Sequence, residues 1–197
     1  MSGHEIARRT RNYIAELDAL KERKLTLNST GNTQQVCRSG RVTIHFDAAF
    51  DRQSSRSATG LLVRNAEGEI LASQAVIHSE IATPFIAEAY VGLQAVKLGI
   101  FMGLNKIEIV GDSKTVIKKC QNTGIDKSVI GAIIRDIQSR KDRFQEIEFR
   151  FVRKPGNVNA HVIAKEARKR GVNFYLLGEI PESVRQVLEN LWSEPLD

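Results

Sequence analysis

The chain has 197 residues, of which 42% are hydrophobic and 26% are charged, so it is long enough to form one globular domain with extensions. Its two cysteines exclude a disulfide framework and a cysteine metal site, and no apolar run is long enough to span a membrane. The formal charge of +6 favours an anionic partner, although a basic surface without a dedicated partner fits it equally well.

The first 40 residues are predicted to form a helix and a polar linker that precede the compact domain. Residues 4–24 place Ile6, Tyr13, Leu17 and Leu20 at roughly heptad spacing, with charged residues on the other faces. This helix is either docked on the rest of the chain or loosely tethered to it, which is the favoured interpretation, or it binds a protein partner. Residues 27–38 show no helical or strand period and form the linker.

Neither a secretory nor an organellar targeting segment is expected at the N-terminus. The apolar core of a signal peptide is missing there, and Glu5, Glu16 and Asp18 are unlike an acid-poor transit peptide. Because Cys37 and Cys120 form no framework, a reducing compartment is expected, either the cytoplasm or the nucleus.

The compact domain is predicted to begin near residue 41. Strand-like runs cover residues 41–48, 58–65 and 69–78, and residues 66–68 form a hairpin connection. A helix at 84–102, a strand at 106–110, helices at 113–121 and 129–143, a strand at 146–152 and a helix at 157–170 follow. This order predicts an α/β domain, residues 41–170, with a mixed sheet and helices on both faces.

Residues 171–197 are predicted to form a C-terminal helical tail. The tail contains an apolar piece at 174–177 and a helix that Pro181 begins.

Three carboxylates lie where separate elements of this domain are expected to converge. Asp47 closes an apolar alternating strand, Glu88 lies within the helix at 84–102, and Asp112 follows the strand at 106–110. Acids in apolar surroundings are costly to ionise unless a cation joins them. The three residues together therefore predict a site for a hard divalent metal.

Each of the three acids also has a simpler interpretation. Glu88 is about 900° around the helix from Lys97, so it faces inward if Lys97 and Gln94 mark the solvent side, and it could then bond a backbone amide or an arginine. Asp112 could cap the following helix. Asp47 is harder to dismiss, because Asp is depleted in strands.

Four segments of the chain resemble the motifs of type 1 ribonuclease H (RNase H) domains, and they occur in the same order. Within that family they are similar to the plant subgroup related to the RNase H segment of reverse transcriptases in non-LTR retroelements. The resemblance covers about residues 41–170, and the tail through Leu191 is similar to that subgroup. The segments are VTIHFDAAF (42–50), FIAEA (85–89), IVGDSK (109–114) and VRKPGNVNAHVIAKEA (152–167).

The resemblance implies an RNase H-like fold with a five-stranded mixed sheet in the order 3-2-1-4-5. It also implies hydrolysis of the RNA strand of an RNA–DNA hybrid with two Mg²⁺ ions, Mn²⁺ being an alternative. Asp47 would bridge both ions, and Glu88 and Asp112 would complete one of the two sites.

The fourth site position departs from the family pattern. Many members carry Asp where this chain has His161, although a histidine there also resembles members of the plant subgroup. His161 would ligate the second metal weakly, favour Mn²⁺, or pass a proton to the leaving group, or else simply cap or pack at the helix start. The short loop 154–156 before it carries no histidine.

The implied partner is an RNA–DNA hybrid, contacted through its phosphates and 2′-hydroxyl groups, with no membrane and with the chain acting as a monomer. Contacts are expected from Ser113, Lys114, Lys154 and Asn157. Further basic residues on the two helices either follow phosphates or form solvated faces; these are Lys118, Lys119, Arg153, Lys165, Arg168, Lys169 and Arg170.

Two other functions stay open at this stage. The chain could be a catalytically weak or inactive RNase H-like module that binds nucleic acid, or an interaction protein that joins an assembly through its N-terminal helix.

Overall fold

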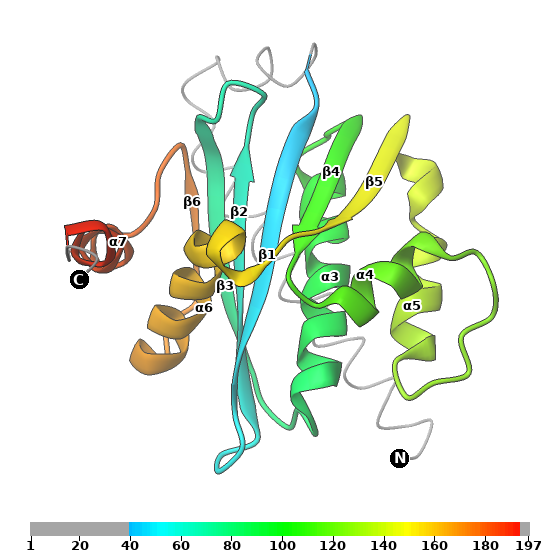
Figure 1. Cartoon of the computed structure of the whole chain (residues 1–197), viewed down its shortest axis with the longest axis horizontal. Helices are drawn as coiled ribbons and strands as arrows, with labels where there is room; N and C mark the ends of the chain where they lie inside the picture. The colour runs from blue at the N-terminus through cyan, green and yellow to red at the C-terminus, as the bar shows by residue number, and fades with distance from the viewer. Residues whose placement is uncertain (1–39, 194–197) are drawn as a thin grey trace. The chain divides into compact units, whose positions relative to one another are not determined.

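The computed structural model describes residues 40–193, so the predicted helix at 4–24 and its linker lie outside the described residues. The described residues form one mixed sheet with helices on both faces (Figure 1). None of the helices in this range has the length and apolarity needed to cross a membrane.

The sheet is built from six strands, β1 (Val42–Asp51), β2 (Arg56–Arg64), β3 (Ile70–His78), β4 (Lys106–Gly111), β5 (Glu146–Phe151) and β6 (Phe174–Leu177). Their order is β5-β4-β1-β2-β3-β6. The pairs β1–β4 and β4–β5 are parallel, whereas β1–β2, β2–β3 and β3–β6 are antiparallel. The predicted mixed sheet is therefore confirmed.

The expectation of five strands in the order 3-2-1-4-5 is wrong, because β6 extends the sheet beyond β3. This strand pairs with Ala72–Ala75 and is covered on both sides, with Phe174 packing toward one core and Tyr175 toward the other. Gly171, at a φ of 67°, ends the preceding helix and turns the chain back toward the sheet. The segment after residue 170 therefore holds a strand as well as a helix.

Two groups of helices cover the two faces of the sheet. One face carries α3 (Pro84–Phe101), α4 (Lys114–Gln121) and α5 (Gly131–Gln138), and the other carries α6 (Val158–Arg170) and α7 (Glu182–Ser193) (Figure 1). Two short 3₁₀ turns, η1 (Lys141–Arg143) and η2 (Lys154–Asn157), lie beside β5 in the chain. The helix predicted at 129–143 is shorter than expected, because residues 139–143 turn and form η1.

Helix α3 begins at the residue that the sequence predicts, but more of its surface is buried than the sequence predicts. Thr83 is its N-cap and accepts a hydrogen bond from the backbone N–H of Ile86, and Pro84 follows in the first turn. The expectation that Gln94 and Lys97 mark a solvent side is wrong. Gln94 is 5% exposed and Lys97 is half-buried, and desolvation lowers the pKa of Lys97 to about 8.

Close packing of α6 on the sheet depends on a single glycine in β2. A Cβ atom at Gly60 would lie 2.2 Å from the carbonyl oxygen of Ala160 and 2.6 Å from the backbone nitrogen of Ala164. Only a residue without a side chain therefore fits between β2 and α6. This contact places the first turns of α6 directly beside β1.

Candidate metal centre

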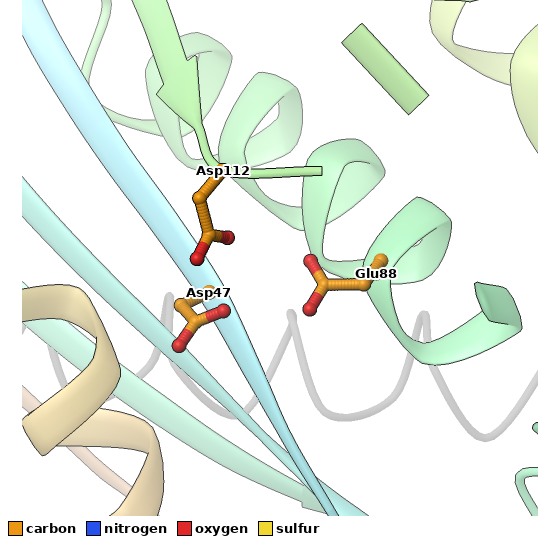
Figure 2. Close-up of side chains that lie close together, drawn as sticks. All are labelled: Asp47, Glu88 and Asp112. Atoms are coloured by element: carbon orange, nitrogen blue, oxygen red, sulfur yellow. The ribbon is translucent and has the colours of Figure 1, made fainter. Parts of the chain in front are cut away.

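Asp47, Glu88 and Asp112 meet in one cluster, although they come from β1, α3 and the end of β4 (Figure 2). Each offers one carboxylate oxygen, and these three atoms all lie within 4.8 Å of one another. The carboxyl groups point toward one another in Figure 2. The convergence predicted from the sequence is thus present in the fold.

Parallel pairing of β1 and β4 brings the two aspartates together. His45 of β1 lies opposite Val110 of β4, so two residues further along each strand the chain reaches Asp47 and Asp112. Gly111 lets the end of β4 pass over the ring of Phe46, because a Cβ atom there would lie 2.4 Å from that ring. Asp47 is 3% exposed and Asp112 is half-buried.

The interpretation of Asp112 as a helix cap is not supported by the geometry. The N-cap of α4 is Ser113, one residue later, and its side chain makes no capping hydrogen bond. Asp112 therefore lies outside the capping position, with its carboxyl group directed to the cluster (Figure 2).

Glu88 enters the cluster from the second turn of α3. Its burial, followed by the charges of Asp47 and Asp112, raises the pKa of its carboxyl group to about 9 from an ordinary value of 4.5. The backbone N–H of Ala48 donates to this group. Its Oε2 atom is buried without a hydrogen-bond partner among the described residues. Burial and the charge of Asp47 also raise the pKa of Asp112.

These features fit a divalent cation. Three carboxylates supply the hard oxygen ligands that Mg²⁺ and Mn²⁺ take. The raised pKa values of Glu88 and Asp112 come first from burial and then from the charges of the neighbouring acids, and a bound cation would offset both effects. The unpartnered Oε2 atom of Glu88 leaves one ligand oxygen free for such an ion.

His161 joins the cluster from the opposite face of the sheet. Its Nδ1 atom lies 2.6 Å from Oδ2 of Asp47, and its side chain is 50% exposed. The two residues are 114 positions apart, and the packing of α6 on Gly60 is what brings them together. The sequence placed His161 at this site only through the family resemblance.

The residues expected to contact nucleic acid divide into two groups. Lys114 and Lys154 are exposed near the cluster, and the charge of Lys154 acts to lower the pKa of Asp112. Ser113 is half-buried at the start of α4. Asn157 is instead 2% exposed and donates from Nδ2 to the carbonyl oxygen of Phe46 at 2.8 Å, so its side chain makes a contact within the fold.

Sequence reasoning missed the structural part that Asn157 plays. Its bond to β1 holds η2, and with it the start of α6, beside the cluster. A polar residue directly before a helix is normally assigned to capping, yet Asn157 makes no capping bond.

Comparisons with known proteins agree with this fold. A family model described as reverse transcriptase-like matches residues 45–167. The N-terminal RNase H domain of Rv2228c from Mycobacterium tuberculosis is 20% identical with a TM-score of 0.60, and the match covers 67% of this chain and 96% of that chain. RNase H1 from the archaeon Halobacterium salinarum is 24% identical with a TM-score of 0.61, covering 66% and 99%.

A third solved structure was determined with nucleic acid bound. It is LC11-RNase H1, isolated from compost by a metagenomic approach and crystallised with an RNA/DNA hybrid, and it is 16% identical with a TM-score of 0.58. The match covers 66% of this chain and 98% of that chain. No curated protein matches the chain. The solved structures show that the fold is RNase H-like.

Proposed function

Since the chain belongs to the reverse transcriptase-like family and has an RNase H-like fold, we propose that it is a metal-dependent endonuclease that hydrolyses the RNA strand of RNA–DNA hybrids. The single observation that carries this proposal is the cluster of Asp47, Glu88 and Asp112, whose ligand oxygens lie within 4.8 Å of one another.

The side chains of the cluster would hold two Mg²⁺ ions, with Mn²⁺ as the alternative. When bound, such ions supply an activated water and stabilise the leaving 3′-oxygen. Asp47 is the most buried of the three acids and the only one bonded to His161, so it is the residue on which the site depends most. Glu88 and Asp112 would each supply a further ligand oxygen. Glu88 must release its proton when a cation binds.

His161 contacts Asp47 and is also accessible to solvent. Its Nδ1 atom contacts the aspartate while half of its side chain is exposed, so Nε2 is available to exchange a proton at the site. Lys114, Lys154 and Ser113 lie beside the cluster and would bind phosphates, which gives little sequence preference.

A cleavage assay tests the proposal. Wild-type protein should cut the labelled RNA strand of a hybrid in Mg²⁺ or Mn²⁺, and Asp47→Asn should reduce the rate by more than about 100-fold while leaving the protein folded. Asp142→Asn is the matched control, because Asp142 is an exposed aspartate in η1. Equal cleavage by wild type and Asp47→Asn would overturn the proposal.

A second candidate function follows from the contact between His161 and Asp47. The histidine engages one carboxylate oxygen and brings no negative charge, so a second metal would be held weakly. The chain would then be a nucleic-acid-binding module with little or no turnover. Tight binding of a hybrid without product in either metal would favour this alternative.

A further inference from the structure

One side of helix α6 carries a row of basic residues that begins at the carboxylate cluster. His161, Lys165, Arg168 and Lys169 are all exposed, whereas Ala160, Ile163, Ala164 and Ala167 on the other side are buried. Offsets of four, seven and eight residues from His161 rotate by about 40°, −20° and 80°, so the four side chains share one side of the helix. We call Lys165, Arg168 and Lys169 the α6 row.

The α6 row follows β1 away from the cluster. At one end His161 contacts Asp47, and further along Nη1 of Arg168 lies 3.4 Å from Oδ2 of Asp51, the last residue of β1. Helix and strand therefore run side by side from the cluster to the β1–β2 hairpin (Figure 1). Arg52 and Arg56 are exposed in that hairpin and continue the positive charge.

The charge of the row is not balanced within the described residues. Lys165 and Lys169 form no ion pair there, and two cations four residues apart on a helix repel each other. The helix dipole favours the cations of the last turn, Arg168, Lys169 and Arg170, but it does not account for Lys165. Arg168 is paired with Asp51, but the two lysines of the row have no acidic partner among the described residues, which fits an external anion.

The length of the row fits several phosphates of one strand. From His161 to Lys169 the helix rises about 12 Å. A nucleic-acid strand in a duplex carries one charge about every 3.4 Å along its axis, so the helix from His161 to the end of the row passes about three phosphates.

Resting on the proposed function, we propose that one strand of the bound nucleic acid leaves the carboxylate cluster along α6, with its phosphates over the α6 row and its course continuing toward the β1–β2 hairpin. The row would therefore bind the nucleic acid on one particular side of the bond that is cut. Lys154, near Asp112, contacts the strand on the other side of the cluster.

The experiment compares two double variants that remove the same charge from opposite ends of the sheet. Lys165→Gln with Lys169→Gln disables the row, and Lys106→Gln with Arg143→Gln is the control, since Lys106 begins the strand that Asp112 follows. All four side chains are exposed, so folding should be little affected, and in α6 Lys and Gln also have similar helix propensity.

Binding of a labelled RNA–DNA hybrid is measured in EDTA as a function of salt, so that no turnover occurs. Each lost phosphate contact should lower the slope of log affinity against log salt by about 0.9, so the row variant should lose nearly two and the control little. Equal slopes for the two double variants would overturn the inference.

A cleavage assay then shows on which side of the cut bond the row binds the nucleic acid. Two hybrids are used, each extending on only one side of a single cut site. The row variant should cut one of them more slowly than the control variant does and cut the other at the control rate. An equal loss on both hybrids would refute the proposed path. Absence of cleavage by wild type would refute the nuclease proposal and leave the binding test of the row intact.

Discussion

Replacing Glu88 with glutamine should stabilise the metal-free protein at neutral and alkaline pH. The pKa of Glu88 is about 9 in the folded chain, against an ordinary value of 4.5, so between these values the folded state keeps a proton that the unfolded state has lost. Stability must therefore fall as the pH rises from 4.5 to 9. Glutamine has no proton to lose, and its amide oxygen can still accept from the backbone N–H of Ala48.

The size of the effect follows from the same pKa values. At pH 7 the solution lies about 2.5 pH units above the ordinary pKa of a glutamate, so keeping Glu88 neutral costs about 3 kcal/mol of folding free energy. The Glu88→Gln variant should recover up to that amount in EDTA. Mg²⁺ should stabilise the wild type by mass action and should stabilise the variant much less.

Urea unfolding at pH 5, 7 and 8.5, with EDTA or Mg²⁺, measures the difference between wild type and variant. Glu67→Gln is the control, because Glu67 is exposed in the β2–β3 hairpin and its neutralisation should change little. A Glu88→Gln variant that is less stable than wild type in EDTA at pH 8.5 would contradict the raised pKa of Glu88. A stability difference between the two proteins that does not widen from pH 5 to pH 8.5 would contradict it as well.

Two further substitutions test the packing and the fourth position of the site. Gly60→Ala should destabilise the protein by about 3 kcal/mol, because its Cβ meets the backbone of α6, whereas Gly124→Ala has open space and should be neutral in the same denaturation assay. A loss below about 1 kcal/mol for Gly60→Ala would contradict the described packing. His161→Asp should lower the Mg²⁺ concentration for half-maximal cleavage by about tenfold, since it adds a carboxylate beside Asp47. An unchanged Mg²⁺ titration would separate His161 from metal binding.

Local signals account for the parts of the fold that the sequence predicted. Val42, Ile44 and Phe46 alternate as a half-buried strand does, and all three are buried in β1. Thr83 and Pro84 mark the start of α3, which ends one residue before the predicted position.

Other features depend on contacts that no local pattern reveals. β6 is four residues long and is a strand only because β3 offers an open edge. Gln94 has the polarity of a surface residue, yet it is 5% exposed in the fold. For β6 the deciding neighbour, β3, is about 100 residues away in the sequence.

The site divides in the same way. Asp47 and Asp112 follow neighbouring parallel strands, so their meeting could be predicted from the strand order. Glu88 does reach the cluster, but the premise that placed it there, a solvent side marked by Gln94, is wrong because Gln94 is buried. The contact of His161 with Asp47 depends on α6 lying against Gly60, which periodicity does not reveal. The bond of Asn157 to Phe46 also has no local signal, because it forms only when η2 folds over β1.

Calorimetric titration of Mg²⁺ into the protein at pH 8 tests most directly whether the three acids form a metal centre. Wild type should bind the ion and release protons, since Glu88 must ionise, and Asp47→Asn should bind at least about tenfold more weakly with little proton release. Identical binding by the two proteins, or no binding by wild type to either Mg²⁺ or Mn²⁺, would contradict the assignment.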